Sequence, residues 1–161
     1  MRADLYIDQV HRPLVERYRP LFDAAVQRRN ALPAGSRQAQ AAQQDVDRYY
    51  HRMYSAGYFR DSYNATNVLS RLDLSWWRDV TPLCTAGGQL QGENLRRFRQ
   101  MVASAPLRLP SKQELEADHA RVDDDGNSLA EWHRYFTEKR AELLEFLDQA
   151  IALDTAVTCS L

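Results

Sequence analysis

Apolar residues along most of the chain recur every three or four positions, which is the spacing of one face of an α-helix. The pattern is clearest near the C-terminal end, from about Leu129 to Asp154. Charged residues fill much of the remainder of that segment, as expected for a helix with one buried face. The apolar stripe consists of Trp132, Phe136, Leu143, Phe146, Leu147, Ala150 and Leu153. We therefore expect a long C-terminal helix.

The first half of the chain carries weaker versions of the same pattern. Helical spacing extends from about Ala3 to Asn30, but Pro13 and Pro20 interrupt it. Because each proline removes a backbone donor and crowds the preceding turn, we expect two shorter helices or one kinked helix. Ser36 is a suitable N-cap for a second helix, which we expect to end near Ala56 with Gly57 as its left-handed cap.

The middle of the chain alternates between short helical stretches and breaks. We expect a third helix over 58–72, followed by a short turn over 75–77 that contains Trp76 and Trp77. A loop over 81–92 then leads to a fourth helix over 93–104. A rigid connector follows from Pro106 to Pro110. Ser111-x-x-Glu114 and Ser128-x-x-Glu131 both match the capping box that begins a helix.

These elements predict an all-α fold. No alternating pattern of five or more residues stands out as a strand, and 161 residues fit one domain with a single core. We expect one domain over residues 1–161, built as a helical bundle of five to seven helices with a long C-terminal helix.

Composition narrows the class of protein. The net charge of −1 argues against a general nucleic-acid coat, which needs surplus positive charge. No apolar run approaches the length of a membrane span, and charged residues throughout the first 20 positions leave no signal-peptide core. Arginine outnumbers lysine 19 to 2, which is typical of a GC-rich genome. We expect a bacterial, cytoplasmic protein without membrane contact, in which Cys84 and Cys159, 75 positions apart, stay reduced.

The segment from Tyr49 to Trp77 is the strongest candidate for a binding surface. It holds 8 of the 16 aromatic residues, with three arginines between them and Arg48 and Arg78 directly beside its two ends. Aromatic faces pack against partner side chains, and arginine forks bind carboxylates or phosphates. Two interpretations stay open, because the same aromatics can form the core of the domain instead.

The functional expectation follows from the surface interpretation: a binding or regulatory protein that recognises a partner protein, without a catalytic centre or cofactor. The proposed anchors are Tyr63, Trp76 and Trp77, since buried Trp, Tyr and Arg dominate measured interface energies. The proposed polar contacts are Arg60, Asn64, Asn67 and Arg71, with Asp61 holding an arginine in place.

A metal-dependent enzyme of the helical-bundle type is the first alternative. Three histidines each follow a carboxylate by three or four positions, which places both groups on one helical face. The candidate ligands are His11, His51, His119, Asp8, Asp47 and Glu116. The acidic run at 123–125 is not a calcium loop, because the flanking ligand positions hold Arg121 and Trp132.

A small nucleic-acid-binding regulator is the second alternative. Residues 1–80 carry 12 basic and 9 acidic side chains, whereas residues 81–161 carry 9 basic and 13 acidic ones. Arg96, Arg97 and Arg99 form a basic cluster that precedes an acidic segment from Glu114 to Glu131. These two segments either steer a charged partner or pair with each other inside the domain.

Overall fold

The structure is a computed structural model that describes residues 2–62 and 67–161. By its internal contacts the chain divides into two compact units. One comprises Ile7–Tyr58, and the other combines Met1–Tyr6 with Phe59–Leu161.

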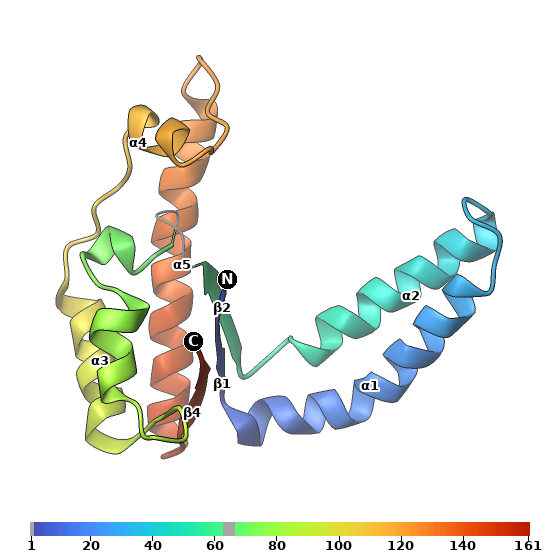
Figure 1. Cartoon of the computed structure of the whole chain (residues 1–161), viewed down its shortest axis with the longest axis horizontal. Coiled ribbons are helices and arrows are strands. Elements are labelled where there is room, and N and C mark those ends of the chain that lie inside the picture. Colours follow the sequence, from blue (N-terminus) through green and yellow to red (C-terminus); the bar gives the residue numbers. More distant parts are fainter. Residues whose placement is uncertain (1, 63–66) are drawn as a thin grey trace. The chain divides into compact units, whose positions relative to one another are not determined.

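The unit Ile7–Tyr58 is a helical hairpin of α1, Asp8–Asn30, and α2, Arg37–Met53. Pro13 and Pro20 both lie inside α1, which is one continuous helix that bends along its length (Figure 1). Of the two expectations for this segment, the single bent helix is therefore the correct one. The predicted N-cap of α2 is also confirmed, since the Ser36 side chain accepts a hydrogen bond from the Ala39 amide at 3.1 Å.

Gly57 connects the segment after α2 to the residue that precedes α1. Its carbonyl accepts a hydrogen bond from the Ile7 amide at 2.8 Å, and its φ of +64° lies in the left-handed region. A Cβ at this position would lie 2.8 Å from Val10 Cβ and 2.9 Å from the His11 amide nitrogen. Only glycine permits both this backbone conformation and this close approach.

The second unit contains a four-stranded sheet, so the expectation of an all-α fold is wrong. Its strands are β1, Arg2–Tyr6; β2, Tyr58–Ser62; β3, Gln89–Leu90; and β4, Val157–Ser160. They are arranged in the order β2-β1-β4-β3. The protein is a mixed α/β structure in which helices predominate.

In β1 and β2, buried and partly exposed residues alternate, as expected for strands. Ala3, Leu5 and Ile7 are fully buried, with the partly exposed Asp4 and Tyr6 between them. Phe59 and Asp61 are buried in β2, which therefore has the two-residue period of a strand. This second pattern is hidden in the sequence, because one of its inward positions holds an ionisable residue.

The two ends of the chain lie side by side in the sheet. β1 and β4 are antiparallel, with Leu5 opposite Cys159. β3 is antiparallel to the other edge of β4, with Leu90 opposite Val157. Because β1 and β4 come from opposite ends of the sequence, this pairing has no local signal.

Three helices complete this unit: α3, Gly92–Ser104; α4, Lys112–Ala117; and α5, Asn127–Ala152. The predicted long C-terminal helix is confirmed in α5, which lies against α3 (Figure 1). The capping box of Ser111 and Glu114 is present at α4. The second predicted box is absent, because α5 begins at Asn127 and Ser128 exchanges hydrogen bonds with Asp123 instead.

The core of this unit forms between the sheet, α3 and α5. Phe59 of β2 packs against Phe146 of α5, with ring centroids 6.1 Å apart. Trp76 packs against Phe98 of α3 at 5.9 Å. Over the described ranges, no helix is both long and apolar enough to cross a membrane.

Candidate partner-binding surface

The predicted third helix over 58–72 is wrong, and this changes the placement of most candidate residues. Its first part is strand β2, and its last part is a 3₁₀ turn, η1, at Ser70–Leu72. Tyr63 and Asn64 lie outside the described residues. Trp76 and Trp77 begin a π-helical turn, η2, at Trp76–Val80, which leads into a second 3₁₀ turn, η3, at Thr81–Leu83.

The structure brings Asp61 and Trp76 together inside the core. Asp61 is 3% exposed and Trp76 is 2% exposed. One carboxylate oxygen of Asp61 accepts hydrogen bonds from the Val68 amide at 3.0 Å and from the Trp76 indole at 3.3 Å. The other oxygen accepts from the Ser62 amide at 2.9 Å. Asp61 therefore connects the end of β2 to the chain that follows the undescribed residues.

Burial has a large effect on the acidity of Asp61. Removal from water raises the pKa of its carboxyl to about 6, although its hydrogen bonds and the nearby charge of Lys139 act in the opposite direction. The group consequently titrates close to neutral pH, despite having three N–H donors around it.

Trp77 has the opposite environment to its neighbour Trp76. Its side chain is 54% exposed, the largest fraction among the large apolar residues of the described chain. Exposure of an indole to water is unfavourable in free energy, because its apolar surface is large. Exposed apolar patches often mark interaction sites. Of the candidate anchors within the described residues, Trp77 is therefore the exposed one.

Hydrogen bonds fix the turn that carries Trp77. The Ser75 hydroxyl accepts from the Arg78 amide at 3.3 Å, and the Ser75 amide donates to Asp79 at 2.7 Å. The Arg78 guanidinium donates to Asp79 at 2.8 Å and to the Asp73 carbonyl at 2.7 Å. Thr81 donates through its hydroxyl to the Trp76 carbonyl at 3.0 Å. We call residues 73–81 the Trp77 turn.

The π-helical geometry is itself informative. π-helical turns are rare, and those inside α-helices occur frequently at functional sites. Here the wide turn places consecutive tryptophans in opposite environments, with Trp76 in the core and Trp77 in solvent. The buried indole of Trp76 thus anchors the turn to the core, while the indole of Trp77 is exposed to solvent.

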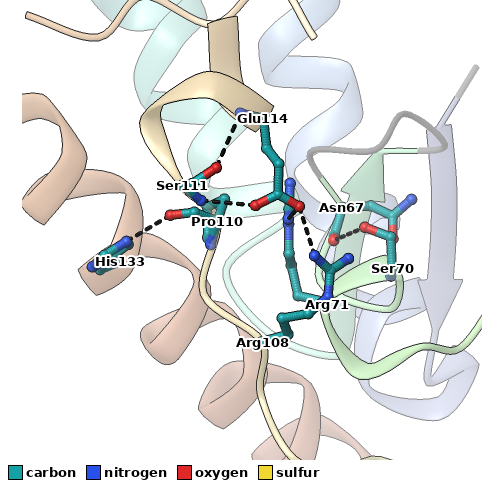
Figure 2. Close-up of polar contacts among 8 residues, drawn as sticks. All are labelled: Asn67, Ser70, Arg71, Arg108, Pro110, Ser111, Glu114 and His133. Atoms are coloured by element: carbon teal, nitrogen blue, oxygen red, sulfur yellow. Dashed lines mark hydrogen bonds and ion pairs between the residues drawn. The ribbon is translucent and has the colours of Figure 1, made fainter. Parts of the chain in front are cut away.

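Arg71 is part of a polar network that Figure 2 displays. Its guanidinium is 3% exposed, lies over the ring of Phe136 at 5.4 Å, and approaches the Glu114 carboxylate at 3.4 Å. Arg108 donates to the same carboxylate oxygen at 2.6 Å, and its amide donates to the Arg71 carbonyl at 2.7 Å. Glu114 also accepts from the Ser111 amide at 2.8 Å.

These interactions explain the acidity of Glu114. The Ser111 amide and the Arg108 guanidinium stabilise its charged form, and they lower the pKa of its carboxyl to about 2. One carboxylate therefore caps α4 and holds two arginines near the connector at 105–111.

A cavity of about 310 Å³ adjoins this network. It is lined by Ser70, Arg71, Arg108, Glu114, Ala117 and Asp118. Among the described residues, neither the buried Arg71 Nε nor one buried oxygen of Asp118 has a hydrogen-bond partner. Arg71 therefore lines this depression and is itself buried.

The two other candidate polar residues have partners within the same unit. Arg60 of β2 donates to Asp4 of β1 at 2.7 Å. Asn67 is buried, and its side-chain oxygen accepts from the Ser70 amide at 2.7 Å. Both contacts stabilise local structure.

The candidate metal ligands do not converge on one centre. Over residues 2–62 and 67–161, no group of three or more His, Cys, Asp or Glu side chains is arranged to hold a metal ion. His11 is buried and stacks on Tyr58, with ring centroids 5.8 Å apart. Burial lowers the pKa of His11 below its usual value, against the opposing charge of Asp8. The remaining candidates, Asp47, His51, Glu116 and His119, are exposed.

The three arginines of the basic cluster in α3 differ in their environments. Arg99 makes a two-pronged ion pair with Asp148 of α5, at 2.8 and 3.0 Å. Arg96 and Arg97 are exposed. Pairing within the unit thus accounts for Arg99, as it does for Arg108 and Glu114.

Sequence reasoning missed Asp79 and Arg108, which hold the Trp77 turn and the Arg71 network. Asp79 had a local signal, because Ser75-x-x-Arg78-Asp79 has the form of a capped turn. Arg108 lies only six positions before Glu114, but its contact with Arg71, far away in sequence, has no local signal.

Comparison of the chain with protein-family models, with curated proteins and with solved structures finds no match. The function is therefore argued from the geometry of the site.

Proposed function

We propose that this chain is a non-catalytic binding protein that recognises a partner protein, with Trp77 as its aromatic anchor. The observation that carries the proposal is the 54% exposure of Trp77 on a turn that hydrogen bonds hold on both sides. Asp61, Arg71 and Trp76 support that turn or the core beneath it, and are not contact residues in this proposal.

The energetic argument rests on preorganisation. A partner that covers the indole gains the free energy of burying a large apolar side chain. Because the Trp77 turn is already fixed, little conformational entropy is lost when the indole is immobilised in a partner's pocket. Tryptophan is enriched among the few residues that dominate binding free energy, for these same reasons.

The test is substitution of Trp77 by alanine, with binding measured on the full chain. A partner captured from the native host is identified, purified and titrated against both proteins. We expect Trp77→Ala to weaken the affinity by at least about tenfold. Because Trp77 is exposed, we expect the thermal midpoint of unfolding to change little.

Leu153→Ala is the matched control, because Leu153 is also a large, exposed apolar residue of the same unit. This variant should bind as the original chain does. Equal affinity of the Trp77→Ala and Leu153→Ala variants would refute the proposal. A fall of many degrees in the midpoint of Trp77→Ala would instead assign the residue to stability.

A further inference from the structure

The fold brings the two cysteines together, although 75 positions separate them in the sequence. Cys84 directly follows η3, and Cys159 lies in β4. The Thr85 amide donates to the Gln89 carbonyl at 2.8 Å, and Gln89 lies opposite Thr158 in the sheet. The Cys159 amide in turn donates to the Gly88 carbonyl at 2.8 Å. These hydrogen bonds fix the segment after Cys84 against the strand that contains Cys159.

The two thiols lie close enough within this arrangement for each to affect the pKa of the other, and both are partly buried and unlinked. Each also lies near a backbone carbonyl: Cys84 Sγ is 3.5 Å from the Val80 oxygen, and Cys159 Sγ is 3.8 Å from the Val157 oxygen. A disulfide requires two cysteines whose sulfurs can approach each other, and the backbone hydrogen bonds above keep the two segments side by side.

We propose that Cys84 and Cys159 form a reversible intramolecular disulfide when the protein is exposed to a peroxide. In the first step a cysteine thiolate attacks one peroxide oxygen, the O–O bond breaks, and a sulfenic acid and hydroxide are formed. In the second step the other thiol attacks the sulfenic sulfur, the S–O bond breaks, and water leaves. Overall, two thiols are oxidised to one disulfide and one hydrogen peroxide is reduced to two water molecules.

The bond would have a defined structural consequence. β4 is the last strand of the chain, and it pairs with β1 on one side and with β3 on the other. A disulfide to Cys84 would connect β4 covalently to the segment that follows η3. It would thereby fix the C-terminal strand in the sheet independently of its hydrogen bonds.

The test treats the reduced, full-length chain with hydrogen peroxide and then maps its cysteines without reduction. We expect the intact mass to fall by two hydrogens, titratable thiols to disappear, and one cross-linked peptide to contain both Cys84 and Cys159. Dithiothreitol should restore both thiols. Thiols that stay free, or links between two chains instead of within one, would overturn the proposal.

Two single substitutions are the matched controls. In the Cys84→Ser and Cys159→Ser variants we expect no intramolecular cross-link under the same treatment, because one sulfur of the pair is missing. A loss of two hydrogens within one chain of either variant would overturn the assignment. The cross-link map of the original chain tests the disulfide itself, even if a variant fails to fold.

Discussion

Asp61 illustrates how one buried carboxyl connects stability to pH. Because its folded-state pKa is about 6, against 3.8 for the exposed group, the folded chain retains the proton at pH values where the unfolded chain has lost it. The contribution of Asp61 to stability is therefore largest below about pH 4 and decreases as the pH rises to about 6. The full change amounts to about 3 kcal/mol.

This titration predicts a signal at Trp76. Its indole donates to the Asp61 carboxylate, so the Trp76 indole N–H resonance should shift with a midpoint near pH 6. The indole of Trp132, which donates to the Arg121 carbonyl, should not shift in that range and serves as the internal control. In Asp61→Asn the Trp76 shift should vanish. A Trp76 resonance that stays constant from pH 4 to 8 in the original chain would contradict the assignment.

Among the elements, α4 and the connector before it depend on Glu114. This side chain completes the capping box of α4 and forms ion pairs with both Arg71 and Arg108. The guanidinium of Arg71 is buried, and a buried charge that loses its partner is costly. The stability of this region therefore depends on one residue that is itself partly exposed.

We predict that Glu114→Ala lowers the thermal midpoint by several degrees, because it removes the cap and leaves Arg71 without its carboxylate. Circular dichroism or calorimetry at neutral pH measures this change. Glu116→Ala is the matched control, since Glu116 lies on the same helix, is exposed, and contacts Lys112 at 3.8 Å. Equal midpoints for the two variants would show that the Arg71–Glu114 pair contributes nothing measurable.

For the molecule as a whole, burial is distributed unevenly between the two units. The helices of the hairpin bury His11, Ala25, Ala42, Val46 and Met53, most of which are small or medium-sized. In the other unit, α5 alone buries Phe136, Leu143, Phe146, Leu147 and Ala150. Hydrophobic burial is the main source of stability, so the second unit has the larger share.

Hydrogen exchange should reveal this difference. We predict that amides in the middle of α1 and α2 exchange faster than those in the middle of α3 and α5, because local opening costs less where few apolar contacts are broken. Exchange monitored by mass spectrometry, with peptides from each helix, measures the protection directly. Equal protection across all four helices would mean that the hairpin is stabilised by contacts other than its own core.

The sequence by itself determined the elements whose signals are local. The apolar stripe of α5, the Ser36 cap of α2, the Ser111–Glu114 capping box and the extent of α3 all depend on residues within a few positions of one another. Periodicity and capping act over that same distance, and for this reason these predictions were correct.

The tertiary structure decided what depends on distant partners. β1 and β4 form strands because the two ends of the chain pair, and β2 buries Asp61, whose charge hides the alternation of its neighbours. The opposite environments of Trp76 and Trp77 also arise only on folding, as does the proximity of the Cys84 and Cys159 segments. Pairing across long separations has no local pattern, because its free energy comes from contacts that exist only once the chain is folded.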